Sequence, residues 1–213
     1  MDNDFKIDWN WVKTMISKKE RITSDKKEIS NTLDECIGVS KSLAKPKIAA
    51  TVKKTGDFRI ASKRLASELK GAAEFYFFLV TIGGGLEKMA TDSMSKGNDL
   101  KGYFFDRIGS FAVESLAESL EENLRREYGR KGRSVSMRFS PGYCDWPIEE
   151  QFALSKTLDF SKAGVRLTES CMMVPQKSIS GVIAVGPKGL FKDKKSPCSI
   201  CDTGDCYYRR VEK

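Results

Sequence analysis

The sequence predicts an α+β fold in which long helices pack beside a mixed, mainly antiparallel sheet. Helical and strand-like segments alternate along the chain, but without the regular spacing of a doubly wound parallel sheet. The 213 residues are 40% hydrophobic and 31% charged, a balance typical of a folded soluble protein. A chain of this length can bury a sizeable core, so we expect a single domain.

Six segments carry apolar residues at helical spacing. The expected helices are residues 9–19, 26–42, 62–69, 86–94, 99–128 and 149–158. The helix at 99–128 is the longest, and Gly109, Ala112 and Ser115 are small residues on its apolar face. This pattern indicates that another element packs closely against that face.

Residues 73–82 form the strongest candidate for a buried central strand, because they are an almost unbroken apolar run. Residues 48–60 are rich in β-branched side chains and predict either a hairpin or a strand followed by a turn. Two further β-rich runs, interrupted by a proline, lie within residues 167–185. The sequence places a basic loop at 130–134 and an irregular aromatic loop at 138–147.

Three consecutive glycines, residues 83–85, end the central strand and open a helix. Backbone N–H groups at such a junction can hold a nucleotide phosphate. The spacing matches neither the dinucleotide fingerprint nor a P-loop, so a tight strand-to-helix turn is the favoured interpretation.

Three regions are expected along the chain. Residues 1–70 form an N-terminal helical and hairpin part, residues 71–187 a core that carries the binding loop, and residues 188–213 a basic, cysteine-rich tail. The N-terminus is acidic and no apolar run is long enough to span a bilayer, which predicts a cytoplasmic protein without a membrane segment.

The chain contains no histidine, although its net charge is +8. Catalytic arrangements that need histidine, histidine-ligated zinc sites and a histidine ligand to cobalamin are therefore excluded. Basic residues gather at 41–70 and 125–138, but no nucleic-acid-binding motif accompanies them. We expect a solvated basic face rather than a nucleic-acid site, or a docking surface for an acidic protein partner.

The tail contains a C-x2-C-x4-C pattern formed by Cys198, Cys201 and Cys206. Three thiolates at this spacing suit zinc or an iron-sulfur cluster, and neighbouring arginines lower thiol pKa values. The run supplies no fourth ligand. Metal binding and a metal-free, redox-active tail therefore stand as alternatives.

A Pro-Gly turn is flanked by Arg138, Ser140 and Tyr143. Such a turn aims a guanidinium, a backbone carbonyl and a phenol into one pocket, which suits a small zwitterionic or nucleoside ligand. The alternative is a capped turn whose tyrosine closes the core.

Two spaced motifs point to a family. The pattern R-x-S-P-G-Y at 138–143 is followed by L-T-E-S-x-x-M-x-P-x-x-S-x-S-G at 167–181. In this order they resemble the activation (reactivation) domain of cobalamin-dependent methionine synthase, whose R-P-A-x-G-Y loop binds S-adenosylmethionine. The segment 116–120, L-A-E-S-L, is similar to the family segment that supplies an acidic ligand residue. The resemblance covers residues 99–187.

The resemblance implies a function. In this family the domain holds S-adenosylmethionine over the corrinoid, so that one-electron reduction of inactive cob(II)alamin is trapped by methyl transfer. It implies that Arg138 pairs with the carboxylate of S-adenosylmethionine and that Glu118 contacts its polar or cationic part. Ser140 and Tyr143 would bind through the loop backbone and the phenol.

The resemblance also implies partners. One partner carries the cobalamin and is either a separate methionine synthase that lacks its own activation domain or another corrinoid protein. The other partner is an electron donor such as flavodoxin or ferredoxin. The chain would then be one component of a methyltransferase activity. No cobalamin, homocysteine or folate module accompanies the motifs, so the chain resembles a free-standing form, and the cysteine tail is a candidate route for the electron. Alternative functions are a non-catalytic cap or chaperone of a corrinoid protein, or an iron-sulfur or zinc redox protein acting through the tail.

Two features depart from the family pattern. Residues 143–147 read Y-C-D-W-P in place of Y-P-A-C-P. Ile7-Asp8-Trp9 repeats an I-D-W setting that supplies an aspartate in the family, but its distance to Glu118 is shorter and the intervening residues align poorly. Asp8 is therefore left outside the predicted site.

Overall fold

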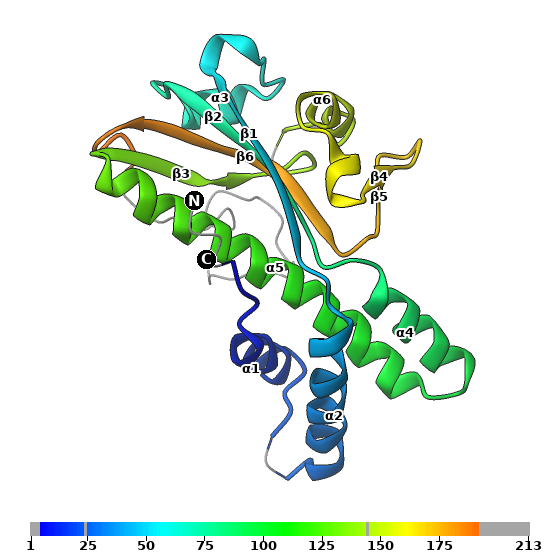
Figure 1. Cartoon of the computed structure of the whole chain (residues 1–213). Coiled ribbons are helices and arrows are strands. Elements are labelled where there is room, and N and C mark those ends of the chain that lie inside the picture. The colour runs from blue at the N-terminus through cyan, green and yellow to red at the C-terminus, as the bar shows by residue number, and fades with distance from the viewer. Residues whose placement is uncertain (1–4, 24, 144, 192–213) are drawn as a thin grey trace.

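The computed structural model describes residues 5–23, 25–143 and 145–191 and confirms the expected α+β fold (Figure 1). Its main sheet is antiparallel, with the strand order β1-β2-β6-β3. These strands are β1 (Lys47–Lys54), β2 (Glu74–Thr81), β3 (Arg133–Phe139) and β6 (Ser178–Pro187). The short strands β4 (Arg166–Leu167) and β5 (Met173–Val174) pair separately. The helices are α1 (Trp9–Lys19), α2 (Lys27–Leu43), α3 (Lys63–Glu68), α4 (Gly85–Ser95), α5 (Asp99–Arg130) and α6 (Glu150–Thr157).

Both faces of the main sheet are covered, and alternate side chains of β2 serve the two faces. Tyr76 and Phe78 enter one apolar cluster, whereas Phe75 and Phe77 enter the other. Helices α1, α2, α4 and α5 contribute to the first cluster, and α3, α6 and the 3-10 helix Phe160–Ala163 contribute to the second. A strand covered on both sides is apolar along most of its length, as β2 is between Glu74 and Thr81, which is why its sequence predicts a central strand.

The longest helix, α5, lies along one face of the sheet, with α1 and α2 on its other side (Figure 1). At the usual helical rise its length is about 48 Å. The expected close approach occurs at Gly109, where an added Cβ would lie 3.1 Å from the Lys177 side chain. The Lys177 ammonium donates to Asp106 and Ser110, at 2.6 and 3.0 Å. The lysine stem crosses the helix closely here, and a side chain at position 109 would require the stem to shift by a few tenths of an ångström.

Residues 83–85 form the tight strand-to-helix turn that the sequence favours. Gly83 has φ +74°, a conformation that glycine adopts without steric cost. A Cβ on Gly85 would lie 2.8 Å from the carbonyl oxygen of Leu43, at the end of α2. The glycines thus serve the turn and its packing against α2.

Two strand predictions are resolved by the structure. Residues 48–60 contain one strand, β1, followed by the 3-10 turn Thr55–Asp57, and β1 pairs with β2 rather than within a local hairpin. The loops placed at 130–134 and 138–147 are partly wrong, because residues 133–139 form the edge strand β3. Buried polar residues interrupt the apolar pattern of β3 and hide its strand character.

None of the helices in the described ranges combines the length with the apolar composition that crossing a membrane requires.

A matched pair of glycine substitutions tests this packing. Gly181→Ala would place a Cβ 2.2 Å from the carbonyl oxygen of Phe139, and we expect the free energy of unfolding to fall by about 3 kcal/mol. Gly38→Ala lies in open space within α2, and we expect a rise of about 1 kcal/mol. Urea denaturation of both variants measures the difference. Equal stabilities for the two variants would contradict the close approach of β3 to β6.

Candidate functional site

A β-bulge in β3 turns the Arg138 side chain toward α5. Val135 pairs with Val185, but Arg138 pairs with Ile183, so β3 contains one residue more than β6 over this stretch. Side chains alternate between the faces of a strand, and the extra residue brings Arg138 to the same face as Val135. Met137 packs in the cluster on the opposite face. The bulge therefore decides which way Arg138 points.

The backbone of the bulge is satisfied by two side chains. The Ser136 hydroxyl accepts from the Ala184 N–H at 2.9 Å and donates to the carbonyl oxygen of Met137 at 2.7 Å. The Arg125 guanidinium, on α5, donates to the carbonyl oxygens of Val135 and Ser136 at 3.2 and 3.3 Å. Strand pairing is disrupted at a bulge, and these contacts replace what it loses.

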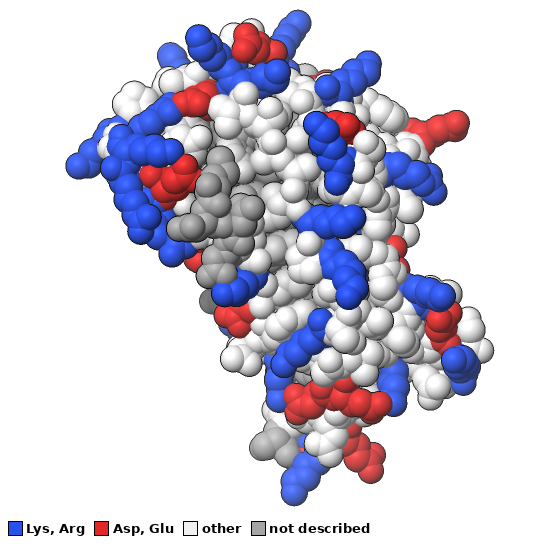
Figure 2. All heavy atoms as spheres, viewed as in Figure 1, with Lys and Arg blue, Asp and Glu red and all other residues white. Residues whose placement is uncertain are grey.

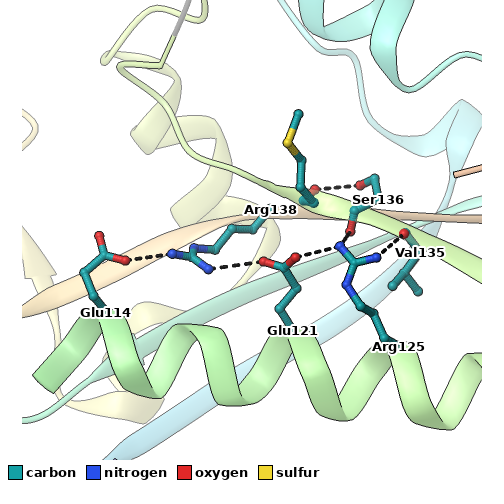
Figure 3. A network of polar contacts seen from close by, with 7 residues as sticks. Glu114, Glu121, Arg125, Val135, Ser136 and Arg138 are labelled. Atoms are coloured by element: carbon teal, nitrogen blue, oxygen red, sulfur yellow. Dashed lines mark hydrogen bonds and ion pairs between the residues drawn. The ribbon is translucent and has the colours of Figure 1, made fainter. Parts of the chain in front are cut away.

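Four charged side chains continue this arrangement between α5 and β3 (Figure 3). Arg138 Nη2 donates to Glu114 Oε2 at 2.7 Å, and Arg138 Nη1 donates to Glu121 Oε2 at 3.1 Å. The second oxygen of Glu121 accepts from Arg125 Nη2 at 2.7 Å. Glu121 thus bridges the two arginines. Arg125 binds the backbone of the bulge, and Arg138 is the predicted ligand-binding residue.

The charge of Arg138 is maintained although the residue is only 6% exposed. Desolvation lowers the pKa of the guanidinium, but the carboxylates of Glu114 and Glu121 more than offset it. The pKa of Arg138 is therefore raised above its ordinary value, with smaller contributions from Tyr143 and Glu118.

Sequence reasoning identifies Glu118 but misses Glu114 and Glu121. The three glutamates follow an i, i+4, i+7 spacing, which puts them on one face of α5. Arg125 lies four residues after Glu121 and forms the corresponding ion pair. This periodicity is the signal that the sequence offers for Glu114 and Glu121, the two carboxylates that contact Arg138. The place of Glu118 in the site stays a prediction.

Ser140 and Tyr143 lie in the turn that follows β3. The Tyr143 N–H donates to the Ser140 carbonyl oxygen at 3.1 Å, and Gly142 between them has φ +90°. Tyr143 is 40% exposed, so the interpretation in which it closes the core is wrong. The Ser140 hydroxyl oxygen is buried and has no hydrogen-bond partner among the described residues. The loop therefore offers an accessible phenol and an unsatisfied hydroxyl beside Arg138.

Trp146 and Asp145, which depart from the family pattern, anchor this loop. Trp146 is 2% exposed and packs in the second apolar cluster. The Asp145 carboxylate accepts from the Ser62 hydroxyl and, at 3.3 Å, from the Arg64 N–H at the start of α3. The hydrogen bond from Ser62 lowers the pKa of Asp145. Both departures thus hold the loop in place from the side away from α5.

Asp8 lies closer to the site than the sequence suggests. Its N–H donates to the Ser115 hydroxyl at 2.8 Å, which places the start of α1 beside the glutamates of α5. Its carboxylate accepts from the Trp11 N–H at 2.9 Å and caps α1. Asp8 comes near the glutamates because α1 packs directly on α5.

Several basic residues of the stretch 125–138 are paired with carboxylates of the same chain. In the stretch 125–138, Arg125, Arg133 and Arg138 form ion pairs with Glu121, Glu74 and Glu114. Figure 2 shows Lys and Arg side chains spread over the visible face, with Asp and Glu side chains among them. Such a mixture is typical of a solvated surface.

The cysteines Cys198, Cys201 and Cys206 lie outside the described residues, so their metal binding stays a prediction. Within the described ranges, Cys36 and Cys171 are buried free thiols. Burial raises the pKa of Cys36 to about 11. No group of three or more histidine, cysteine, aspartate or glutamate residues in those ranges has the arrangement of a metal site.

Two comparisons with known proteins bear on this geometry. A family model described as "Vitamin B12 dependent methionine synthase, activation domain" matches residues 53–191. The chain belongs to this activation-domain family. A crystal structure of the MetH reactivation domain bound to AdoHcy is also similar, with a TM-score of 0.63 and 18% sequence identity. That match covers 89% of this chain and 76% of the other, and it shows the same fold.

Membership of the activation-domain family confirms the resemblance drawn from the two spaced motifs. Both motifs, at 138–143 and 167–181, fall inside the matched range, as does Glu118. Asp8 and helices α1 and α2 precede that range, although the structural match extends over more of the chain. The individual ligand roles of the site residues stay predictions.

The central role of Glu121 can be tested by stability. Glu121→Gln removes the charge that bridges the buried Arg138 and the partly exposed Arg125, and we expect the free energy of unfolding to fall by about 3 kcal/mol. Glu122→Gln makes the same change at an exposed position of α5 and should alter it by less than about 0.5 kcal/mol. Urea denaturation of both variants measures these changes in the free energy of unfolding. An equally small change at the two positions would contradict the bridging role of Glu121.

The loop anchor predicts a pH dependence. The folded-state pKa of Asp145 is lowered, so its stabilising effect is present above the unfolded-state value near 3.8 and is lost as pH falls through the folded-state pKa. We expect Asp145→Asn to melt below the wild type at pH 7 and the two melting temperatures to converge below pH 3.8. Thermal melts from pH 7 downward measure this. A gap that persists or widens in acid would contradict it.

Proposed function

We propose that this activation-domain protein binds S-adenosylmethionine and supports the reductive methylation of inactive cob(II)alamin on a separate methionine synthase or other corrinoid methyltransferase. The observation that carries the proposal is the buried Arg138 surrounded by carboxylates of α5, in a chain that belongs to this family. S-adenosylmethionine would supply the methyl group, and a cytoplasmic donor such as flavodoxin or ferredoxin would supply one electron.

The residue types fit the two ends of this ligand. A guanidinium binds a carboxylate through charge-assisted hydrogen bonds, and we assign such a contact to Arg138 and the carboxylate of S-adenosylmethionine. An anionic side chain stabilises a sulfonium or ammonium group, the role proposed for Glu118. The unsatisfied Ser140 hydroxyl and the exposed phenol of Tyr143 would contribute hydrogen bonds from the loop. The related reactivation domain that binds AdoHcy supports a ligand of this class.

Charge balance adds support. Glu114, Glu118 and Glu121 carry three negative charges, and Arg125 and Arg138 carry two positive charges, so this group is anionic by one unit. S-adenosylmethionine carries a sulfonium, an ammonium and a carboxylate, and is cationic by one unit. Opposite net charges favour association in a partly desolvated site. These residues would hold the methyl carbon toward the corrinoid, and positioning of this kind lowers the barrier to methyl transfer.

Isothermal titration of S-adenosylmethionine tests the proposal. We expect the wild type to bind and Arg138→Lys, which keeps the charge but loses the forked geometry, to bind at least about tenfold more weakly. Tyr143→Phe is a second variant, and its exposed position keeps the core intact. Because the partner can complete the site, the titration is repeated with a cob(II)alamin-loaded corrinoid protein. Absence of binding in both formats would contradict the proposal.

The same variants separate the alternative functions. A non-catalytic cap or chaperone would bind its corrinoid partner equally well with Arg138→Ala or Glu118→Ala. An iron-sulfur or zinc redox protein would lose function only when Cys198, Cys201 or Cys206 is replaced. Metal analysis of the purified protein, with Cys201→Ala as control, reports on the tail directly, and finding neither iron nor zinc would remove that alternative.

A further inference from the structure

The Arg138 guanidinium is already engaged by carboxylates of its own chain. Glu114 and Glu121 each accept a hydrogen bond from one of its two outer nitrogens, at 2.7 and 3.1 Å (Figure 3). The residue is only 6% exposed, so little of the guanidinium surface remains for a third carboxylate. A ligand carboxylate that pairs with Arg138 must therefore compete with one of these glutamates.

The two glutamates differ in their exposure to solvent. The Glu121 side chain is 5% exposed and accepts a second hydrogen bond from Arg125, which also binds the carbonyl oxygens of the bulge. Releasing Glu121 would leave two guanidinium groups without their shared carboxylate, at high cost in a buried site. The Glu114 side chain is 20% exposed, four times as much as that of Glu121. A partly exposed carboxylate can turn into solvent and be hydrated there.

We propose that Glu114 is a built-in competitor for the ligand carboxylate: it occupies Arg138 in the unliganded protein and yields its place when the ligand binds, while Glu121 remains. This inference rests on the proposed function and assigns a role to a residue that tunes affinity. Glu114 keeps the buried guanidinium neutralised before the ligand arrives, and a ligand without a carboxylate has no means of replacing it. The site thus selects for an amino-acid carboxylate.

Replacing an ordinary ligand-binding residue weakens binding of the ligand, whereas replacing Glu114 should strengthen it. Glu114→Gln keeps the size of the side chain but removes its charge, which weakens its hold on Arg138. We expect Glu114→Gln to bind S-adenosylmethionine about tenfold more tightly than the wild type, the scale of one charge-assisted hydrogen bond. Decarboxylated S-adenosylmethionine, which retains both cationic groups, should not bind more tightly to the variant. Isothermal titration of both ligands measures the two affinities.

Glu122→Gln is the matched control, because it removes the same charge from an exposed position of the same helix. It should leave the affinity for both ligands unchanged. Circular dichroism and thermal melts confirm that Glu114→Gln is folded, as expected while Glu121 still pairs with both arginines.

Each outcome decides between the claims. If the wild type binds S-adenosylmethionine and Glu114→Gln binds it equally or more weakly, the competitor role is wrong and the proposed function stands. Equal tightening for both ligands would also overturn the inference, since a general charge effect would explain it. If only Glu114→Gln binds detectably, the competitor role is supported in a strong form. If neither protein binds, the inference fails together with the proposed function.

Discussion

A guanidinium buried between a helix and an edge strand must be neutralised by carboxylates, and this requirement organises the site. Arg138 meets it through Glu114 and Glu121, and Glu121 also binds Arg125. Arg125 in turn satisfies the carbonyl oxygens at the bulge that orients Arg138. The direction of the side chain, its charge and the strand irregularity therefore depend on one another. A substitution of Glu121 would affect all three, because one of its carboxylate oxygens binds Arg138 and the other binds Arg125.

The loop after β3 is held from both sides. On one side, Arg138 fixes the end of the strand against α5, and on the other, Trp146 fills the second apolar cluster. Asp145 ties the loop to the start of α3 through Ser62 and the backbone. The exposed Tyr143 is thus carried by a short turn between two anchors. Under the proposed function, this arrangement would present a small ligand to a second protein without rearranging the core.

Much of the fold is predictable because apolar periodicity reports burial. The sequence predicts the central strand β2 and the long helix α5 to within a few residues of their actual ends. It does not reveal the strand β3, because Ser136 and Arg138 are polar and yet buried. Their polar groups are satisfied by hydrogen bonds and ion pairs, which a hydropathy pattern does not detect. Even the alternation of Val135 and Met137 is misleading, since the bulge sends them to opposite faces.

The site is predictable only in its motifs. Arg138 and Glu118 stand in spaced motifs shared with the activation-domain family, whereas Glu114 and Glu121 depend on which face of α5 meets β3. A single sequence does not reveal that contact, although the i, i+4, i+7 spacing marks the glutamates as neighbours. Asp8 illustrates the same limit, because its proximity arises from the packing of α1 on α5.

A crystal structure of the protein grown with S-adenosylmethionine is the most direct test of the role assigned to Arg138. We expect the ligand carboxylate on Arg138, with Glu121 still bridging Arg125 and Arg138 and with Glu114 turned away. A ligand bound elsewhere, with both glutamates still paired to Arg138, would contradict it.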